Sequence, residues 1–171
     1  MGDRKIFVIS DTHFGHENII GYCDRPFQNA KEMDECIADN WTSVVRDCDI
    51  VYHLGDVYMG VSGREILPKL TGRKRLILGN HDNGKDQNLH AAFQKIAMWR
   101  MFPEFGALLS HVPLYPTALK PDMVNVHGHI HNRPSPTERH INASVEMLGY
   151  RPIELEELLA FAPVSTEKAD G

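Results

Sequence analysis

Short runs of apolar residues recur along the chain, and each run stops abruptly at a polar residue. The first, within residues 5–10, holds four consecutive apolar side chains and ends at Ser10-Asp11. A continuous apolar run of this length is typical of a strand that is buried on both faces. Comparable runs predict further strands at residues 49–54, 75–78, 107–110, 124–127 and 140–143.

Between these strands, apolar positions repeat at the spacing of a helix. The clearest segment covers residues 30–45, where Asn29 is a candidate N-cap and one face carries Met33, Ile37, Trp41, Val44 and Val45. Shorter helices are predicted over residues 17–22, 64–70, 89–97 and 154–161. Alternating strands and helices predict an α/β fold, in which the loops that follow the strands gather at one edge.

Each of the first five predicted strands is followed by side chains that can bind a metal ion. They comprise two carboxylates, one amide and four imidazoles: Asp11, His13, Asp56, Asn80, His111, His129 and His131. Mixed nitrogen and oxygen ligands suit Mn²⁺, Fe²⁺, Zn²⁺ or Ni²⁺ and disfavour a structural zinc site, which is rich in cysteine. Seven ligands exceed what one zinc ion needs, so they predict two ions if the carboxylate of Asp56 bridges them. Ions ~3.5–4 Å apart would hold a hydroxide and clamp phosphoryl oxygens during in-line attack.

Two neighbours of Asn80 are candidates for catalysis. His81 could protonate the oxygen of a leaving group or donate to a phosphoryl oxygen, because the ordinary pKa of histidine suits proton transfer near pH 7. Asp82 could orient His81 or the loop that carries it.

Taken singly, these motifs have unremarkable explanations. An Asp-x-His sequence is usually a turn, residues 79–84 have the composition of a turn, and the histidines at 129 and 131 could be exposed on a strand. Five separate apolar runs that each end in such residues are harder to explain without a shared site.

Composition narrows the class of protein. The 171 residues carry a net charge of −5, with 42% hydrophobic and 24% charged residues, which is ordinary for a globular protein. We predict one domain over residues 1–164 and a flexible tail over residues 165–171.

The absence of a basic stripe argues against an extended nucleic-acid surface, and no apolar run is long enough for a membrane span. Three cysteines without a CxxC pair and the absence of a signal sequence predict a cytoplasmic protein.

The ordered motifs resemble those of the calcineurin-like metallophosphoesterases, and the resemblance covers residues 6–131. The blocks are D-x-H at 11–13, GD at 55–56, GNHD at 79–82, an isolated histidine at 111, and GH-x-H at 128–131. The resemblance implies a two-sheet β-sandwich flanked by helices, with a dinuclear site at the carboxyl-end loops of the strands, as in a compact bacterial or phage-type branch. It further assigns Asp11, His13, Asp56 and His131 to one ion, and Asp56, Asn80, His111 and His129 to the other.

The substrate is less well defined by the sequence. Because the chain has no large added cap domain, we expect an open site and predict a phosphodiesterase that acts on nucleotide-like or small diesters. Two divalent ions, most simply Mn²⁺, are the predicted cofactors. A phosphomonoesterase is the alternative; a metal-site scaffold without turnover and a dinuclear redox protein are less favoured. Asn80 and His81, with His16 and Arg133, are candidate substrate contacts, while Arg25 and Arg133 could equally be solvated loop cations.

Overall fold

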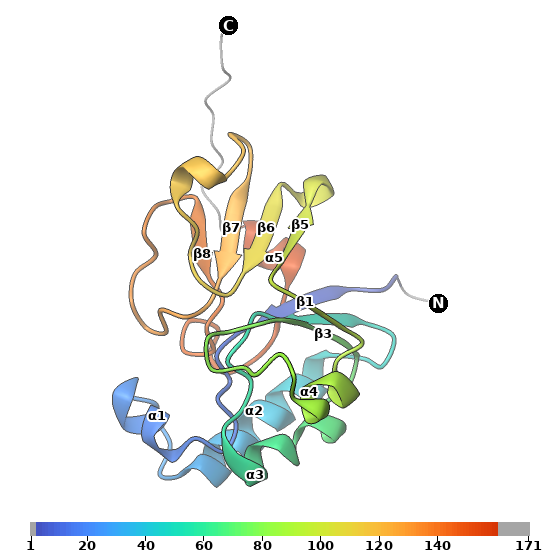
Figure 1. Ribbon diagram of the computed structural model, residues 1–171, viewed down its shortest axis with the longest axis vertical. Helices are drawn as coiled ribbons and strands as arrows, with labels where there is room; N and C mark the ends of the chain where they lie inside the picture. Colours follow the sequence, from blue (N-terminus) through green and yellow to red (C-terminus); the bar gives the residue numbers. More distant parts are fainter. Residues whose placement is uncertain (1–2, 161–171) are drawn as a thin grey trace, which may run out of the picture.

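Residues 3–160 are described by the computed structural model, and they form two β-sheets with helices around them (Figure 1). The first sheet has the strand order β4-β3-β2-β1-β9, made of Lys95–Ala97, Arg73–Ile77, Ile50–His53, Ile6–Ile9 and Ile153–Glu154. The second has the order β5-β6-β7-β8, made of Trp99–Phe102, Ala107–Ser110, Val124–His127 and His140–Asn142. The predicted two-sheet α/β architecture is therefore confirmed.

Strand direction brings the predicted metal-binding loops to one edge. Strands β1 to β4 run parallel, as do β6 to β8, while the edge strands β9 and β5 run antiparallel to their neighbours. Parallel strands all present their carboxyl ends at the same side of a sheet. A parallel bridge between Ser10 and Ser144 joins the end of β1 to the segment after β8. The carboxyl edges of the two sheets therefore meet.

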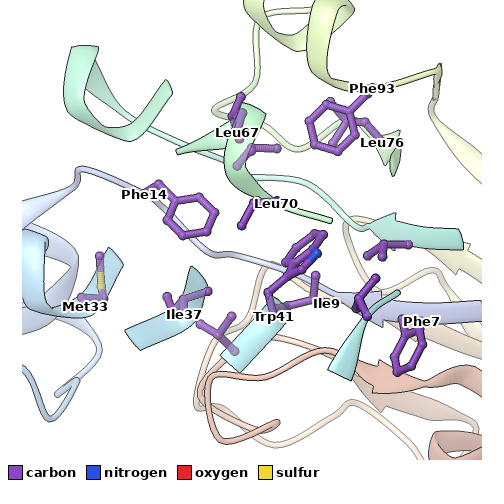
Figure 2. Close-up of a cluster of buried hydrophobic side chains, with 14 of the residues drawn as sticks. Phe7, Ile9, Phe14, Met33, Ile37, Trp41, Leu67, Leu70, Leu76 and Phe93 are labelled. Atoms are coloured by element: carbon purple, nitrogen blue, oxygen red, sulfur yellow. The ribbon is translucent and has the colours of Figure 1, made fainter. Parts of the chain in front are cut away.

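Both faces of the first sheet are covered, which explains the continuous apolar runs. In β1, Val8 points into the core between the two sheets, whereas Phe7 and Ile9 point into the core beneath the helices. Figure 2 shows this second core, with Trp41 at its centre near Ile9. Trp41 is fully buried, as predicted, and its indole N–H donates to the Thr71 carbonyl at 3.0 Å.

Within the described residues, the chain has five α-helices: α1 Glu17–Tyr22, α2 Ala30–Val44, α3 Gly60–Arg64, α4 Gln87–Ala92 and α5 Leu155–Ala160. Short 3₁₀ helices lie between α3 and β3 (η1 Leu67–Lys69), between β5 and β6 (η2 Pro103–Phe105) and between β6 and β7 (η3 Pro116–Ala118). Figure 1 shows α2, α3 and α4 on the face of the first sheet that lies away from the second. The predicted cap of α2 is confirmed, because the Asn29 side chain accepts from the Glu32 amide at 2.9 Å.

Two helix predictions need correction. The helix predicted over residues 89–97 ends at Ala92, and residues 95–97 form β4 instead, because the Gln94 amide bonds to the Lys74 carbonyl and starts a ladder with β3. The helix predicted over 64–70 is replaced by α3, which ends at Arg64, and by η1. Pro68 lacks an amide proton and is tolerated only in the first turn of a helix, where η1 holds it.

The predicted domain boundary and the predicted tail reach beyond the residues that the structure describes. One domain over residues 1–164 stays a prediction, and the predicted tail, residues 165–171, lies outside the described residues. Within residues 3–160, no helix has the length and apolar character that crossing a membrane requires.

Candidate metal centre

Main-chain hydrogen bonds link the loops that carry the predicted metal ligands. The His13 amide donates to the Asp56 carbonyl at 3.0 Å, which joins the loops after β1 and β2. The Gly128 amide donates to the His111 carbonyl at 2.8 Å, which joins the loops after β6 and β7. The ligand candidates are thus held relative to one another by backbone as well as by side chains.

Six of the seven predicted ligands fall into two compact groups. The groups are Asp11, His13 and His131, and Asp56, His111 and His129. Within each group, one potential ligand atom from every residue lies within 4.8 Å of the others. Each group is therefore a candidate site for one ion.

Asp56 lies between the two groups. Its Oδ2 atom is 3.6 Å from His13 Nε2, in the first group, and 3.5 Å from His111 Nε2, in its own group. Its other oxygen, Oδ1, accepts from the His81 amide at 2.9 Å. A carboxylate with one oxygen facing both groups is placed to bridge two cations.

The His13 ring has the features of a metal ligand. It is buried, yet neither ring nitrogen has a hydrogen-bond partner among the described residues. A buried polar atom without a partner costs about 1–3 kcal/mol, so this ring needs a partner that the polypeptide does not supply. Burial, reinforced by the nearby Arg25 guanidinium, lowers the pKa of His13 to about 2. The ring is therefore neutral near pH 7, as a metal ligand must be.

Asn80 completes the second group. Its Oδ1 atom lies 2.8 Å from His111 Nε2 and 2.8 Å from His129 Nδ1. The other nitrogen of His111, Nδ1, lies 2.8 Å from the Leu54 carbonyl, which can only accept, so Nδ1 carries the proton. On the neutral ring, His111 Nε2 then presents a lone pair toward the Asn80 oxygen. A divalent cation bound beside both atoms would be coordinated by that lone pair and by the oxygen.

The backbone at the predicted ligands is unusual. Asp11, His13, Asp56, His129 and His131 all have positive φ, between 48° and 70°. For residues other than glycine this left-handed region costs of order 1–3 kcal/mol, and such strain concentrates at functional sites. The loops therefore hold the side chains in geometries that folding alone would not favour.

Asp82 acts on the loops rather than facing the metal groups. Its carboxylate accepts from the amides of Asp56 at 2.9 Å, Val57 at 3.0 Å and Gly79 at 2.8 Å. It thereby ties the loop after β3 to the loop after β2. Of the roles predicted for Asp82, this geometry supports orientation of the loop.

His81 lies at the open side of the site. Its side chain is exposed, and its ring centroid is 5.6 Å from that of His13. Only its backbone amide contacts Asp56, so the ring is free to contact a substrate. His16 is half-buried, with its ring centroid 5.4 Å from that of His13, and Arg133 is exposed on the loop after His131.

Arg25 is neither a solvated cation nor free to contact a substrate. Its side chain is fully buried and donates through Nε and Nη2 to Glu146 Oε1, at 2.9 and 2.7 Å. Nη2 also donates to the Asp11 carbonyl at 2.7 Å, and Nη1 to the Thr12 carbonyl at 3.0 Å. The prediction of a solvated loop cation is therefore wrong for Arg25, since this residue holds the loop after β1 in place.

Glu146 is a residue that the sequence analysis missed. Its Oε1 atom lies 3.0 Å from His131 Nδ1, so it orients that imidazole and leaves Nε2 free for a metal. The signal was available in principle, because Glu146 follows the strand predicted at 140–143, as the ligands follow theirs. Ser144, from the same segment, donates to Asp11 Oδ2 at 2.9 Å.

Glu146→Gln should weaken metal binding at the group that contains His131. We expect about a 10- to 100-fold loss of affinity for one ion, because outer carboxylates hold ligand imidazoles in place. Calorimetric metal titration measures it, with Glu154→Gln as a control, since Glu154 pairs with Lys5 away from the site. Unchanged affinity in a folded Glu146→Gln variant would remove this role.

Comparison with known proteins adds independent information. A family model described as the calcineurin-like phosphoesterase superfamily domain matches residues 5–146, which span all five loops that carry the predicted ligands. The chain is 39% identical over 167 residues to the uncharacterized protein MJ1445 of Methanocaldococcus jannaschii, covering 91% of this chain and 90% of that one. It is 36% identical over 112 residues to the gene 66 protein of Mycobacterium phage L5, and the match covers 62% of this chain and 54% of that one. The crystal structure of AQ665, a protein of unknown function from Aquifex aeolicus, matches with a TM-score of 0.76 and 29% identity. The match covers 91% of this chain and 98% of that one.

Proposed function

The chain belongs to the calcineurin-like phosphoesterase superfamily and is a metal-dependent phosphoesterase, and from that premise we propose that it is a phosphodiesterase with a dinuclear metal centre. The observation that carries the proposal is the position of Asp56 Oδ2, which lies within 3.6 Å of a ring nitrogen from each of the two ligand groups. Two-ion sites of this kind serve in-line displacement at phosphorus.

We assign the metal-holding residues as the sequence analysis does. Asp11, His13, Asp56 and His131 would hold one divalent ion; Asp56, Asn80, His111 and His129 would hold the other. The ions, when bound, supply Lewis acidity that activates water and draws charge from the phosphoryl oxygens. Mn²⁺ is the proposed metal, with iron, zinc or nickel as alternatives.

The remaining roles belong to side chains around this centre. His81 donates a proton to the leaving-group oxygen or a hydrogen bond to a phosphoryl oxygen, and its exposed ring suits either task. Asp82 positions His81 and Asn80 by tying their loop to the loop of Asp56. His16 and Arg133 are proposed substrate contacts at the rim of the site.

The buried arginine beside the centre cannot offset the second negative charge of a monoester. A monoester near pH 7 carries close to two negative charges, whereas a diester carries one, so a monoesterase gains from an additional cation. Arg25 lies beside Asp11, but its guanidinium is already paired with Glu146. The Arg25 guanidinium is therefore not available to pair with the second negative charge of a monoester.

Metal removal and a matched substrate pair test the proposal. Chelation should abolish hydrolysis, and Mn²⁺ should restore it better than other divalent ions. We expect kcat/KM for bis(p-nitrophenyl) phosphate to exceed that for p-nitrophenyl phosphate by about tenfold or more, or about 1.4 kcal/mol. The reverse preference would establish the monoesterase. Metal-loaded protein inactive on both esters would favour the scaffold.

A further inference from the structure

An apolar groove of about 700 Å³ begins at the metal centre and extends over the outer face of the second sheet. Two of the proposed ligands, Asn80 and His111, line it together with residues of the second sheet and of the segment after β6, among them Leu108, Leu114 and Ala118. Its volume exceeds what a phosphate group needs and falls in the range of pockets for small organic molecules. The groove is therefore continuous with the proposed metal site and large enough for the organic part of a substrate.

Eight of the twelve residues that line the groove have apolar side chains. None of its twelve lining residues is Asp, Glu, Lys or Arg. The hydroxyl of Ser110 is already engaged, because it donates to the Val112 carbonyl at 2.7 Å. Recognition in this groove must therefore come from apolar contact and stacking.

The groove exposes an aromatic ring. Trp99 is 65% exposed and its neighbour Met98 is 63% exposed, although both side chains are large and apolar. Alternation along β5 explains the placement: Trp99 and Met101 share the groove side, while Phe102 points into the core between the sheets. The indole thus offers a flat and largely exposed surface to the groove.

The chemistry of the groove excludes some occupants. A phosphate backbone would be bound by Lys and Arg, which the groove lacks. A neutral aromatic ring would stack on the indole and remove apolar surface from water. The shared residues Asn80 and His111 place such a ring next to a phosphate held at the metal centre.

We propose that this groove binds the uncharged aromatic ester group of a phosphodiester, a nucleobase or an aryl ring, with Trp99 as its stacking surface. The assignment rests on the proposed phosphodiesterase function. It makes Trp99 a specificity-determining residue, which selects esters by their organic group and leaves the metal ligands unchanged.

Fluorescence tests the groove without relying on turnover. The chain has two tryptophans, and Trp41 is fully buried, so a probe in the groove should change the emission of Trp99 alone. We expect methyl phenylphosphonate, whose ring is held by a P–C bond that hydrolysis does not break, to change the emission of zinc-loaded protein, and methyl methylphosphonate to leave it unchanged. The change should disappear in Trp99→Phe, which lacks the indole. Equal responses to the two phosphonates would overturn the proposal.

Inhibition constants supply the second measurement. The phenyl phosphonate should inhibit more tightly than the methyl one by roughly 5- to 150-fold, as expected for one stacked ring. Trp99→Ala should remove most of this preference and Trp99→Phe should retain much of it. Val61→Ala should leave it intact, because Val61 is an exposed apolar side chain outside the groove.

The outcomes separate this proposal from the proposed function. Hydrolysis of diesters without any ring preference would overturn the groove assignment and leave the phosphodiesterase standing. A ring-specific emission change in protein that hydrolyses no phosphoester would support ring binding in the groove and overturn the proposed phosphodiesterase activity. If the protein is a dimer that Trp99→Ala converts to a monomer, and neither protein prefers the phenyl phosphonate, the groove is covered by a second copy and the proposal is overturned.

Discussion

Asp56→Asn should lose both metal ions together and most of the activity. Asp56 Oδ2 lies about equally far from a nitrogen of each ligand group, at 3.6 and 3.5 Å. Asparagine has nearly the same shape but no negative charge, and its single oxygen cannot serve two ions and the His81 amide at once. Loss of several kcal/mol of transition-state stabilisation corresponds to a fall in kcat/KM of about 10³-fold or more.

Elemental analysis of purified protein, together with diester hydrolysis, measures this effect. Asp39→Asn is the matched control, because Asp39 is exposed on α2, away from the site. Loss of only one ion from Asp56→Asn would remove the bridging assignment. Retention of both ions with full activity would remove Asp56 from the centre altogether.

His81→Ala should keep both ions and lower kcat by about 10²- to 10⁴-fold, the usual contribution of a positioned acid. The His81 ring is exposed and is not a member of either ligand group. Its amide, which the substitution preserves, makes the hydrogen bond to Asp56. The side chain can therefore be removed without disturbing the bridge.

The leaving group distinguishes the two roles of His81. If the ring protonates the leaving oxygen, the loss should be larger for an alkyl or phenyl leaving group than for p-nitrophenolate, which departs without help. If the ring only stabilises a phosphoryl oxygen, the loss should be similar for all of them. His90→Ala, at an exposed histidine of α4, is the control. Loss of metal from His81→Ala would make His81 a ligand and overturn both roles.

The predictions from sequence succeeded where the signal was local. Strands β6 and β7 begin and end where the apolar runs indicate, and α2 begins at its predicted cap. A run that ends abruptly at a polar residue marks both a buried strand and the loop after it. The same pattern therefore predicted the fold and the side chains that approach one another at its edge.

Other features depend on partners far away along the chain. The ion pair of Arg25 with Glu146 joins residues 121 positions apart, and neither residue alone shows a pattern that indicates the other. β4 is a strand because the edge of β3 is available to it, which overrides the helical spacing of residues 89–97. The groove at Trp99 likewise arises only when β5 lies beside β6 and near the loop after β3.

The left-handed conformations at five proposed ligands bear on how such a site persists through evolution. Together they cost about 5–15 kcal/mol, which is comparable with the entire net stability of a typical domain. A descendant released from selection for hydrolysis would gain stability from any substitution that lets one of these loops relax. Positive φ at those five positions is thus a structural marker of continuing selection for activity, beside the ligand side chains themselves.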